Sequence, residues 1–141
     1  MSVRMPEADG AVLARRERIV AALRTIVPGE GVIASEREMR PFESDGLTAY
    51  RQLPMVVVLP ETTEQVADVL RYCNAEGIKV VPRGAGTSLS GGALPLGDGV
   101  LLGLSKFNRI REIDFANRVV VAEPGVTNLA ISSAVAHAGF Y

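Results

Sequence analysis

The sequence predicts an α+β fold with an α/β-like start, in which a small parallel βαβ unit is followed by antiparallel strands. Residues 55–59 and 78–81 are short apolar runs rich in β-branched side chains, as in strands covered on both faces. Between them, apolar residues recur at helical spacing over 66–73. Residues 110–114 and 118–122 then flank a three-residue connection that is typical of a hairpin.

The first part of the chain, residues 1–53, is predicted to be a helical extension. Apolar residues recur near helical spacing over 11–26, with arginines on the opposite face. Ser35 and Glu38 are spaced as in a capping box and predict a second, short helix. Residues 42–52 are mixed and rich in turn formers, and we interpret them as a connector.

The helix of the βαβ unit has signals at both ends. Thr62 and Gln65 form a capping-box pattern at its start, and Gly77 suits the left-handed residue at its end. The connections are short enough for one right-handed crossover between parallel strands. A third apolar strand is predicted over 99–104. The loop after residues 78–81 therefore leaves the carboxyl end of a parallel strand, where open α/β sheets bind ligands.

The last part of the chain carries the predicted hairpin and one more helix. Asn117 lies in the hairpin connection, and Asn tolerates a positive φ there. Thr127 is predicted to cap a helix that Gly139 ends. Residues 140–141 look like the start of a further strand, whose unpaired edge favours association between chains.

A glycine-rich loop with hydroxyl side chains follows the strand at 78–81. Glycine permits backbone angles that a side chain forbids, and it lets amide N–H groups crowd around a ligand. Successive amides that point inward form a nest for phosphate oxygens. We expect Arg83 to supply a positive charge at the rim of this loop. No residue of the loop is an obvious proton-transfer group. The predicted cradle consists of Pro82, Arg83, Gly84, Ala85, Gly86, Thr87, Ser88, Leu89, Ser90, Gly91 and Gly92.

Two common phosphate-binding motifs do not fit this loop. In a P-loop, lysine and a hydroxyl residue follow the second glycine, but Gly92 and Ala93 stand there. In a Rossmann fingerprint a third glycine opens a helix, but Leu89 takes its place and Pro95 interrupts any helix. A mobile surface loop with no ligand is the structural alternative.

Three motifs together resemble the FAD-binding domain of the vanillyl-alcohol oxidase (PCMH-type) flavoproteins. They are LPETTEQV at 59–66, PRGAGTSLSGG at 82–92 and VAEPGV at 121–126, and the likeness covers residues 53–141. It is strongest to the branch that holds the D-subunit of glycolate oxidase and D-lactate dehydrogenase. The resemblance implies that FAD is the cofactor and that the loop binds its pyrophosphate. It also adds Pro124 and Gly125 to the cofactor-binding residues.

The resemblance further implies an FAD-linked oxidoreductase that oxidises a D-2-hydroxyacid such as glycolate or D-lactate and passes electrons to an acceptor. Other oxidase subunits are candidate partners, and no catalytic residue can be named. In that family a second FAD-contacting segment begins beyond residue 141, so we expect residues 54–141 to be a truncated FAD-binding domain. We expect weak or absent FAD binding and no turnover by this chain alone. The alternatives are a non-catalytic module for a nucleotide or other phosphate ligand, and an inactive fragment with an empty loop.

Composition limits the remaining functions. The chain has 141 residues, a hydrophobic content of 48% and a net charge of −1, so it suits one domain and predicts no nucleic-acid partner. No apolar run approaches the ~20 residues of a membrane-spanning helix, and arginines interrupt the apolar centre that a signal peptide needs. We therefore expect a cytoplasmic protein. Binding to partner proteins would place it peripherally at the inner membrane. A single cysteine predicts neither an internal disulfide nor a metal site.

A few single residues outside the loop carry reactive or charged groups. His137 is the only histidine, and it lies near a helix end, where the dipole favours a positive charge. No carboxylate has a motif-like spacing to it, so a role as catalytic base is not expected. No histidine lies within the glycine loop, so covalent attachment of flavin there is not predicted. Cys73 lies on an apolar stripe and is expected to be buried. Lys106 is interpreted as a solvated loop residue, and the resemblance places Asp45 near the entrance to the flavin site.

Overall fold

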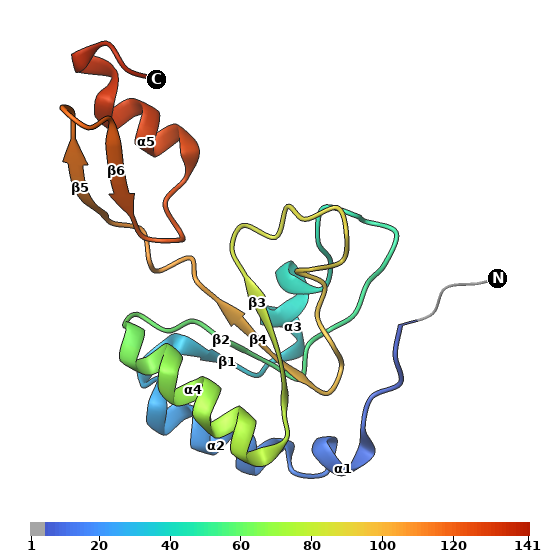
Figure 1. Cartoon of the computed structure of the whole chain (residues 1–141). Helices are drawn as coiled ribbons and strands as arrows, with labels where there is room; N and C mark the ends of the chain where they lie inside the picture. Colours follow the sequence, from blue (N-terminus) through green and yellow to red (C-terminus); the bar gives the residue numbers. More distant parts are fainter. Residues whose placement is uncertain (1–4) are drawn as a thin grey trace.

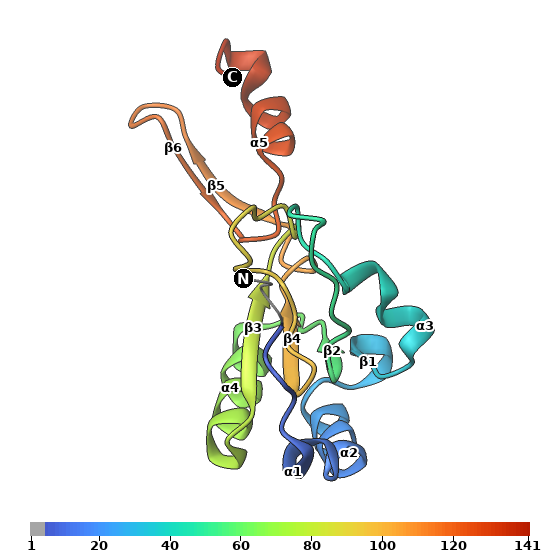
Figure 2. The same ribbon diagram turned by 90° about the vertical axis from the view of Figure 1, so that its right-hand side faces the viewer.

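The glycine loop is carried by a sheet of four strands, β1 (Val32–Ile33), β2 (Val56–Val58), β3 (Lys79–Arg83) and β4 (Gly99–Gly103). The computed structural model describes residues 5–141 (Figure 1). The strands lie in the order β1, β2, β4, β3, which Figure 2 shows from the side. β2, β4 and β3 are parallel, and β1 runs antiparallel to β2. A sheet with both parallel and antiparallel pairing, packed against helices, confirms the predicted α+β fold class.

Strand β4 is the central strand of the parallel part. Leu101 pairs with Val57 on one side and with Val81 on the other. β2 and β3 are therefore parallel, as the predicted βαβ unit requires, but they are not neighbours. All five residues of β4 are buried, which explains why its sequence is apolar without alternation.

Helix α4 (Thr63–Glu76) connects β2 to β3 and has the predicted ends. The Thr62 hydroxyl accepts a hydrogen bond from the Gln65 amide at 3.2 Å, and the Gln65 side chain accepts one from the Glu61 amide at 2.7 Å. Gly77 ends the helix with a φ of 67°, a left-handed value that glycine adopts without steric cost. Local signals therefore fix both ends of this helix.

The sheet buries side chains on both faces. Alternate residues of a strand point to opposite faces, so Val56, Val58, Val100 and Leu102 share one face, and Val57 and Leu101 share the other. The first face packs against α4 and against α2 (Arg16–Ile26), whose Ile19 and Leu23 are fully buried. The second face packs against Met39 of the short helix α3 (Glu36–Met39). Two small cores thus lie on either side of one sheet.

The N-terminal part differs from its prediction in three ways. The predicted helix over 11–26 is divided at Arg15 into α1 (Gly10–Leu13) and α2. The Ser35 side chain makes no capping hydrogen bond, although Ser35 does precede α3. β1 adds a strand where only helices were predicted, with short 3₁₀ turns on either side of it, η1 (Gly29–Gly31) and η2 (Arg40–Phe42).

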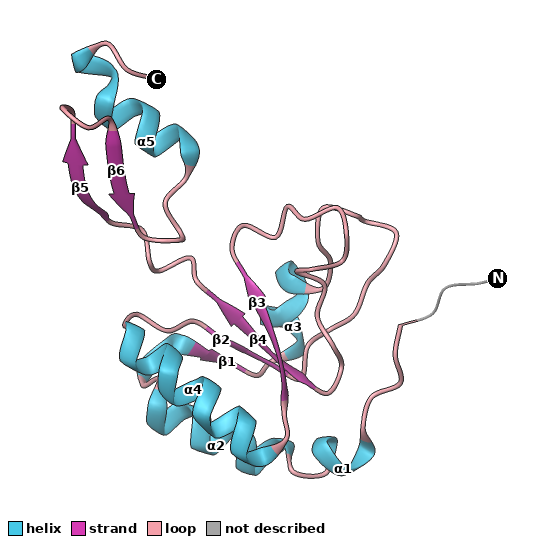
Figure 3. Ribbon diagram, in the orientation of Figure 1, coloured by secondary structure: helices cyan, strands magenta, loops and turns pink. Residues whose placement is uncertain are grey.

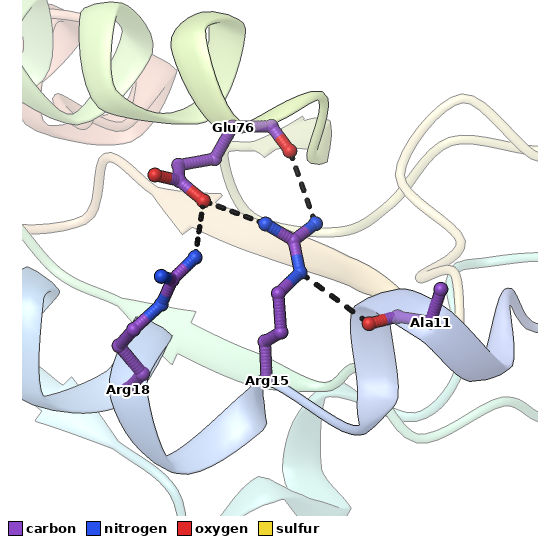
Figure 4. Close-up of polar contacts among 4 residues, drawn as sticks. All are labelled: Ala11, Arg15, Arg18 and Glu76. Carbon is purple, nitrogen blue, oxygen red and sulfur yellow. Dashed lines mark hydrogen bonds and ion pairs between the residues drawn. The ribbon is translucent and has the colours of Figure 1, made fainter.

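Three polar contacts join the N-terminal helices to the end of α4 (Figure 4). The Arg15 guanidinium donates to the Glu76 carboxylate at 2.6 Å and to the Glu76 carbonyl at 3.2 Å, and its Nε donates to the Ala11 carbonyl. Arg18 donates to the same carboxylate at 2.8 Å. Part of the arginine-rich face of the predicted helix is therefore used for contacts within the chain.

A hairpin and a helix form a separate layer beyond the sheet. They are β5 (Ile110–Asp114), β6 (Val119–Ala122), α5 (Asn128–Val135) and the 3₁₀ turn η3 (Ala136–Ala138). Figures 1 and 2 both show this unit projecting from the end of the sheet where β4 finishes. The Thr127 hydroxyl accepts a hydrogen bond from the Ala130 amide at 3.1 Å, as predicted for a cap. Gly139 ends the segment with a φ of 82°.

Two expectations for this unit are wrong. Arg118, with a φ of 56°, takes the positive angle that was expected at Asn117. Asn117 instead donates from its amide and its side chain to the Asp114 carboxylate. Residues 140–141 form no strand, and the Phe140 ring packs near the Phe115 ring at a centroid distance of 5.8 Å. The association argued from a strand edge therefore loses its basis.

Over residues 5–141, none of the helices combines the length and the apolar character that are needed to span a membrane.

Candidate functional site

The carboxyl ends of the three parallel strands meet at one edge of the sheet. Two contacts join the segments that leave this edge. The Leu104 amide after β4 donates to the carbonyl of Arg83, the last residue of β3, at 2.9 Å. Lys106 pairs with Glu61 at 2.6 Å, which joins the segments after β4 and β2. Lys106 was interpreted as a solvated loop residue, but it makes this contact within the protein.

The glycine loop leaves β3 at this edge, and Figure 3 shows it as a long connection between β3 and β4. Gly86 and Gly91 have φ values of 73° and 78°, in the left-handed region that favours glycine. The Leu94 amide donates to the Gly91 carbonyl at 3.2 Å and closes a turn after the loop. The second part of the loop is therefore folded by its own backbone.

The first part of the loop has free backbone donors. Within the part of the chain that the structure describes, the amides of residues 85–89 donate no hydrogen bond to the protein. The side chains of Thr87 and Leu89 are exposed, so solvent reaches this segment. Backbone N–H groups require a partner when they are covered, and a ligand with anionic oxygens supplies one. The free amides of residues 85–89 are therefore suited to bind the oxygens of a diphosphate.

Arg83 does not lie at the rim of the loop, so this expectation is wrong. The residue is only 9% exposed, and its guanidinium packs against Gly86 of the loop. Its Nη1 donates to the Ser44 carbonyl at 2.8 Å and to the Ala93 carbonyl at 3.1 Å. The guanidinium also lies 5.8 Å from the centroid of the Phe42 ring. Burial lowers the pKa of Arg83, and the nearby charge of Asp45 opposes this effect.

Residues 44–47, which were predicted to belong to a connector, pack against the glycine loop. A Cβ atom on Gly46 would lie 2.7 Å from the Thr87 carbonyl oxygen and 3.0 Å from that of Ser88. Beside it, Asp45 is buried, and its Oδ1 accepts a hydrogen bond from the Leu47 amide at 3.0 Å. Figure 3 shows the connection that contains these residues beside the glycine loop. The only sequence signal for this contact is the Asp-Gly pair itself.

Gly125 lies against the segment that follows β4, and Pro124 beside it is exposed. The Gly125 amide donates to the Phe107 carbonyl at 2.7 Å, so this N–H group is used within the protein. Because Leu104 of the same segment bonds to Arg83, the turn at 123–125 and the start of the glycine loop are linked through one short stretch of backbone. A role of Pro124 and Gly125 in cofactor binding stays a prediction.

Glu123 holds this turn to the hairpin. Its buried carboxylate accepts hydrogen bonds from the Arg109 amide at 2.8 Å and from the side chains of Arg109 and Arg111. The bond from the Arg109 amide, reinforced by the two arginine side chains, holds the pKa of Glu123 below its ordinary value although burial acts in the opposite direction. Glu123 is therefore an ionised structural residue at neutral pH.

The remaining candidates lie away from the loop. His137 is on η3 and packs edge-on against the Phe115 ring at a centroid distance of 5.7 Å. Cys73 is buried in α4, and burial raises the pKa of its thiol to about 11. Among the residues described, no group of three or more His, Cys, Asp or Glu side chains is placed to hold a metal ion. The structure thus gathers residues 44–47, 83–92 and 123–125 at one edge.

Comparison with known sequences identifies a family for this chain. Residues 54–141 match a protein family described as "FAD binding domain". The chain is 48% identical over 126 residues to glycolate oxidase subunit GlcD of Escherichia coli (strain K12), covering 89% of this chain and 25% of that protein. It is 34% identical over 121 residues to mitochondrial D-2-hydroxyglutarate dehydrogenase of Bos taurus, covering 86% of this chain and 22% of that protein. The chain thus spans about a quarter of the length of these relatives.

Solved structures share the fold. p-Cresol methylhydroxylase superposes with a TM-score of 0.80 at 22% identity, over 99% of this chain and 27% of that one. 4-Ethylphenol oxidase from Gulosibacter chungangensis gives a TM-score of 0.79 at 26% identity, over 97% and 27% of the two chains. At 22% identity the first likeness shows the fold alone. The arrangement of sheet, loop and hairpin described above is therefore one that known proteins share.

Proposed function

This chain belongs to the family of FAD-binding domains, and on that premise we propose that its residues 82–92 hold the pyrophosphate of FAD. The observation that carries the proposal is the set of free amides at residues 85–89. They lie at the carboxyl edge of parallel strands, where α/β sheets bind ligands. The hydroxyl groups of Thr87, Ser88 and Ser90 add donors between the glycines, and the turn at Pro124 and Gly125 is the proposed second contact.

We propose that the whole protein is an FAD-linked oxidoreductase that acts on a D-2-hydroxyacid, with glycolate as the first candidate. The 48% identity to glycolate oxidase subunit GlcD supports this assignment, and the relative named for D-2-hydroxyglutarate supports the substrate class. When bound, FAD would supply the electron-accepting chemistry, and the loop of this chain would orient and anchor it. None of the described residues is assigned a part in the chemical step.

Partners, location and domain division are also proposals. We propose that other oxidase subunits and an electron acceptor work with the whole protein, because the relative at 48% identity is named as a subunit. A cytoplasmic protein that reaches the inner membrane through such partners fits this assignment. We propose a cofactor-binding domain at 54–141 and an extension at 1–53, although Ile19 and Leu23 of that extension share a core with the sheet.

Titration of FAD into the chain, followed by quenching of flavin fluorescence, tests the proposal. We expect weak, saturable binding that ADP, which carries the same diphosphate, displaces. Gly86→Val is expected to lower the affinity at least tenfold, because position 86 has a φ of 73° and a Cβ there would lie 2.6 Å from the Arg83 Nε. Gly10→Ala, a glycine substitution with nothing within 4 Å, is the matched control.

Two results would overturn the assignment. One is binding of ATP or a sugar phosphate without any binding of flavin. The other is an unchanged affinity for FAD in a folded Gly86→Val variant, since the loop would then not approach the diphosphate.

A further inference from the structure

One guanidinium group joins the two ends of the glycine loop. Arg83 precedes the first glycine of the loop, and its Nη1 reaches the carbonyl of Ala93, which follows the last one, at 3.1 Å. The same nitrogen donates to the Ser44 carbonyl at 2.8 Å. Arg83 therefore ties the start of the loop to its end and to the segment at 44–47.

The middle of the loop is held from the same two sides. Gly46, two residues after Ser44, packs against the Thr87 and Ser88 carbonyls so closely that a Cβ would overlap them. Gly86 packs against the Arg83 guanidinium in the same manner. The two carbonyls are turned toward Gly46, whereas the amides of residues 85–89 have no partner among the residues described. The positions of Arg83 and Gly46 thus determine which backbone groups remain free for a ligand.

Asp45 supplies the opposite charge. Its side chain is 5% exposed, and its Oδ2 is buried without a hydrogen-bond partner in the described part of the chain. A buried carboxylate costs several kcal/mol unless another charge or donor compensates it. Arg83, which is itself buried, donates to the carbonyl of Ser44, the residue before Asp45, so the two buried charges belong to segments that are hydrogen-bonded to each other.

We propose that Arg83 and Asp45 form a positioning pair that holds the glycine loop in its ligand-accepting shape before the ligand arrives. The Arg83 guanidinium then holds the loop in place through hydrogen bonds to backbone carbonyls, and it does not contact the ligand. The anionic ligand is bound by backbone amides and hydroxyl groups. The part of the proposal that concerns ligand affinity rests on the proposed function. The part that concerns loop order does not.

The first arm of the experiment measures loop order without ligand. Backbone ¹⁵N relaxation of residues 84–92 is compared between the wild type and Arg83→Met, with the exposed Arg24→Met as the matched loss of a positive charge. We expect order parameters in the loop to fall from those of rigid backbone to those of a flexible segment in Arg83→Met, and to stay unchanged in Arg24→Met. Equal order parameters for residues 84–92 in the wild type and in Arg83→Met would overturn the proposal.

The second arm tests coupling of the two charges through thermal unfolding. Arg83→Met leaves the Asp45 carboxylate buried without compensation, so it is expected to lower the unfolding midpoint more than the double variant Arg83→Met, Asp45→Asn does. Strict additivity of the two single substitutions would contradict the pairing.

The third arm uses FAD as the probe and separates positioning from direct contact. Lysine keeps the charge but lacks the planar guanidinium that packs against Gly86 and lies over the Phe42 ring. We therefore expect Arg83→Lys to lose affinity nearly as much as Arg83→Met, tenfold or more, with the salt dependence of binding unchanged in both. Full affinity in Arg83→Lys, together with a weaker salt dependence in Arg83→Met, would show a direct phosphate contact and overturn the proposal. Absence of flavin binding by the wild type would count against the proposed function only, and the first two arms would then decide.

Discussion

Gly125 lies so close to Leu104 that a Cβ atom at position 125 would be 2.5 Å from the Leu104 carbonyl oxygen. The Phe107 and Ser105 carbonyls surround the same point at 2.7 and 3.1 Å. Backbone atoms cannot withdraw as a flexible side chain can. The connection from β4 to β5 and the turn between β6 and α5 are therefore packed together through a position that has room for hydrogen only.

Gly125→Ala is expected to destabilise the protein by about 1–3 kcal/mol, as overpacking against fixed groups does. Urea unfolding followed by circular dichroism measures the difference. Gly84→Ala is the matched control, because nothing lies within 4 Å of the added atom and its φ is not positive. Equal losses in the two variants would show that packing against Leu104 is not the cause.

Glu123→Gln is expected to lose most stability near neutral pH and progressively less in acid. The hydrogen bond from the Arg109 amide and the two arginine side chains keep the pKa of Glu123 below its ordinary value in the folded protein. Its contribution is therefore present above the ordinary pKa of a glutamate and is lost as the pH falls through the lower folded value. Unfolding free energies of both proteins from pH 7 to pH 3 should converge. A constant difference would contradict this account.

Cys73 predicts a loss of stability in alkali. Burial raises its pKa to about 11, so between the ordinary thiol pKa and that value the unfolded chain releases the proton while the folded protein keeps it. Stability should fall there by at most about 1.4 kcal/mol for each pH unit. Cys73→Ala lacks the titrating group and should show a shallower decline over pH 8–11. Parallel declines in the two proteins would assign the effect to other groups.

The stability of the contact between the N-terminal helices and α4 should depend more on apolar packing than on ion pairs. Arg15→Ala removes a pair whose partners are both about one-third exposed, so we expect a loss of about 0–1 kcal/mol. Ile19→Ala removes a fully buried side chain from the core beneath the sheet and should cost about 2–5 kcal/mol. Chemical denaturation of both variants gives the comparison. A larger loss for Arg15→Ala would show that the contacts in Figure 4 dominate.

The features that were predicted from sequence depend on neighbours along the chain. Thr62 and Thr127 bond to amides three residues away, and Gly77 directly follows the helix that it ends. The apolar runs of β2 and β4 are buried on both faces, so their composition alone identifies them. These signals gave the order of the elements and the place of the glycine loop.

The features that were missed depend on partners far apart in the sequence. Arg83 and Ser44 are separated by 39 residues, and neither has a local signal for the other. Gly46 has the appearance of an ordinary turn residue until Thr87 is placed against it. β1 has only two residues, too few for a periodic pattern. It forms because the free edge of β2, at Val57 and Val58, pairs with it.

The central position of β4 sets an order of events during synthesis. β2 and β3 leave the ribosome before β4, yet they share no backbone pairing with each other: β2 pairs with β1 on one edge, and β4 is the strand that joins β2 to β3. Until residues 99–103 have emerged, both strands present open edges to the solvent and to other nascent chains. The glycine loop lies between β3 and β4 in the sequence, so its two ends are brought together only when that last strand is inserted.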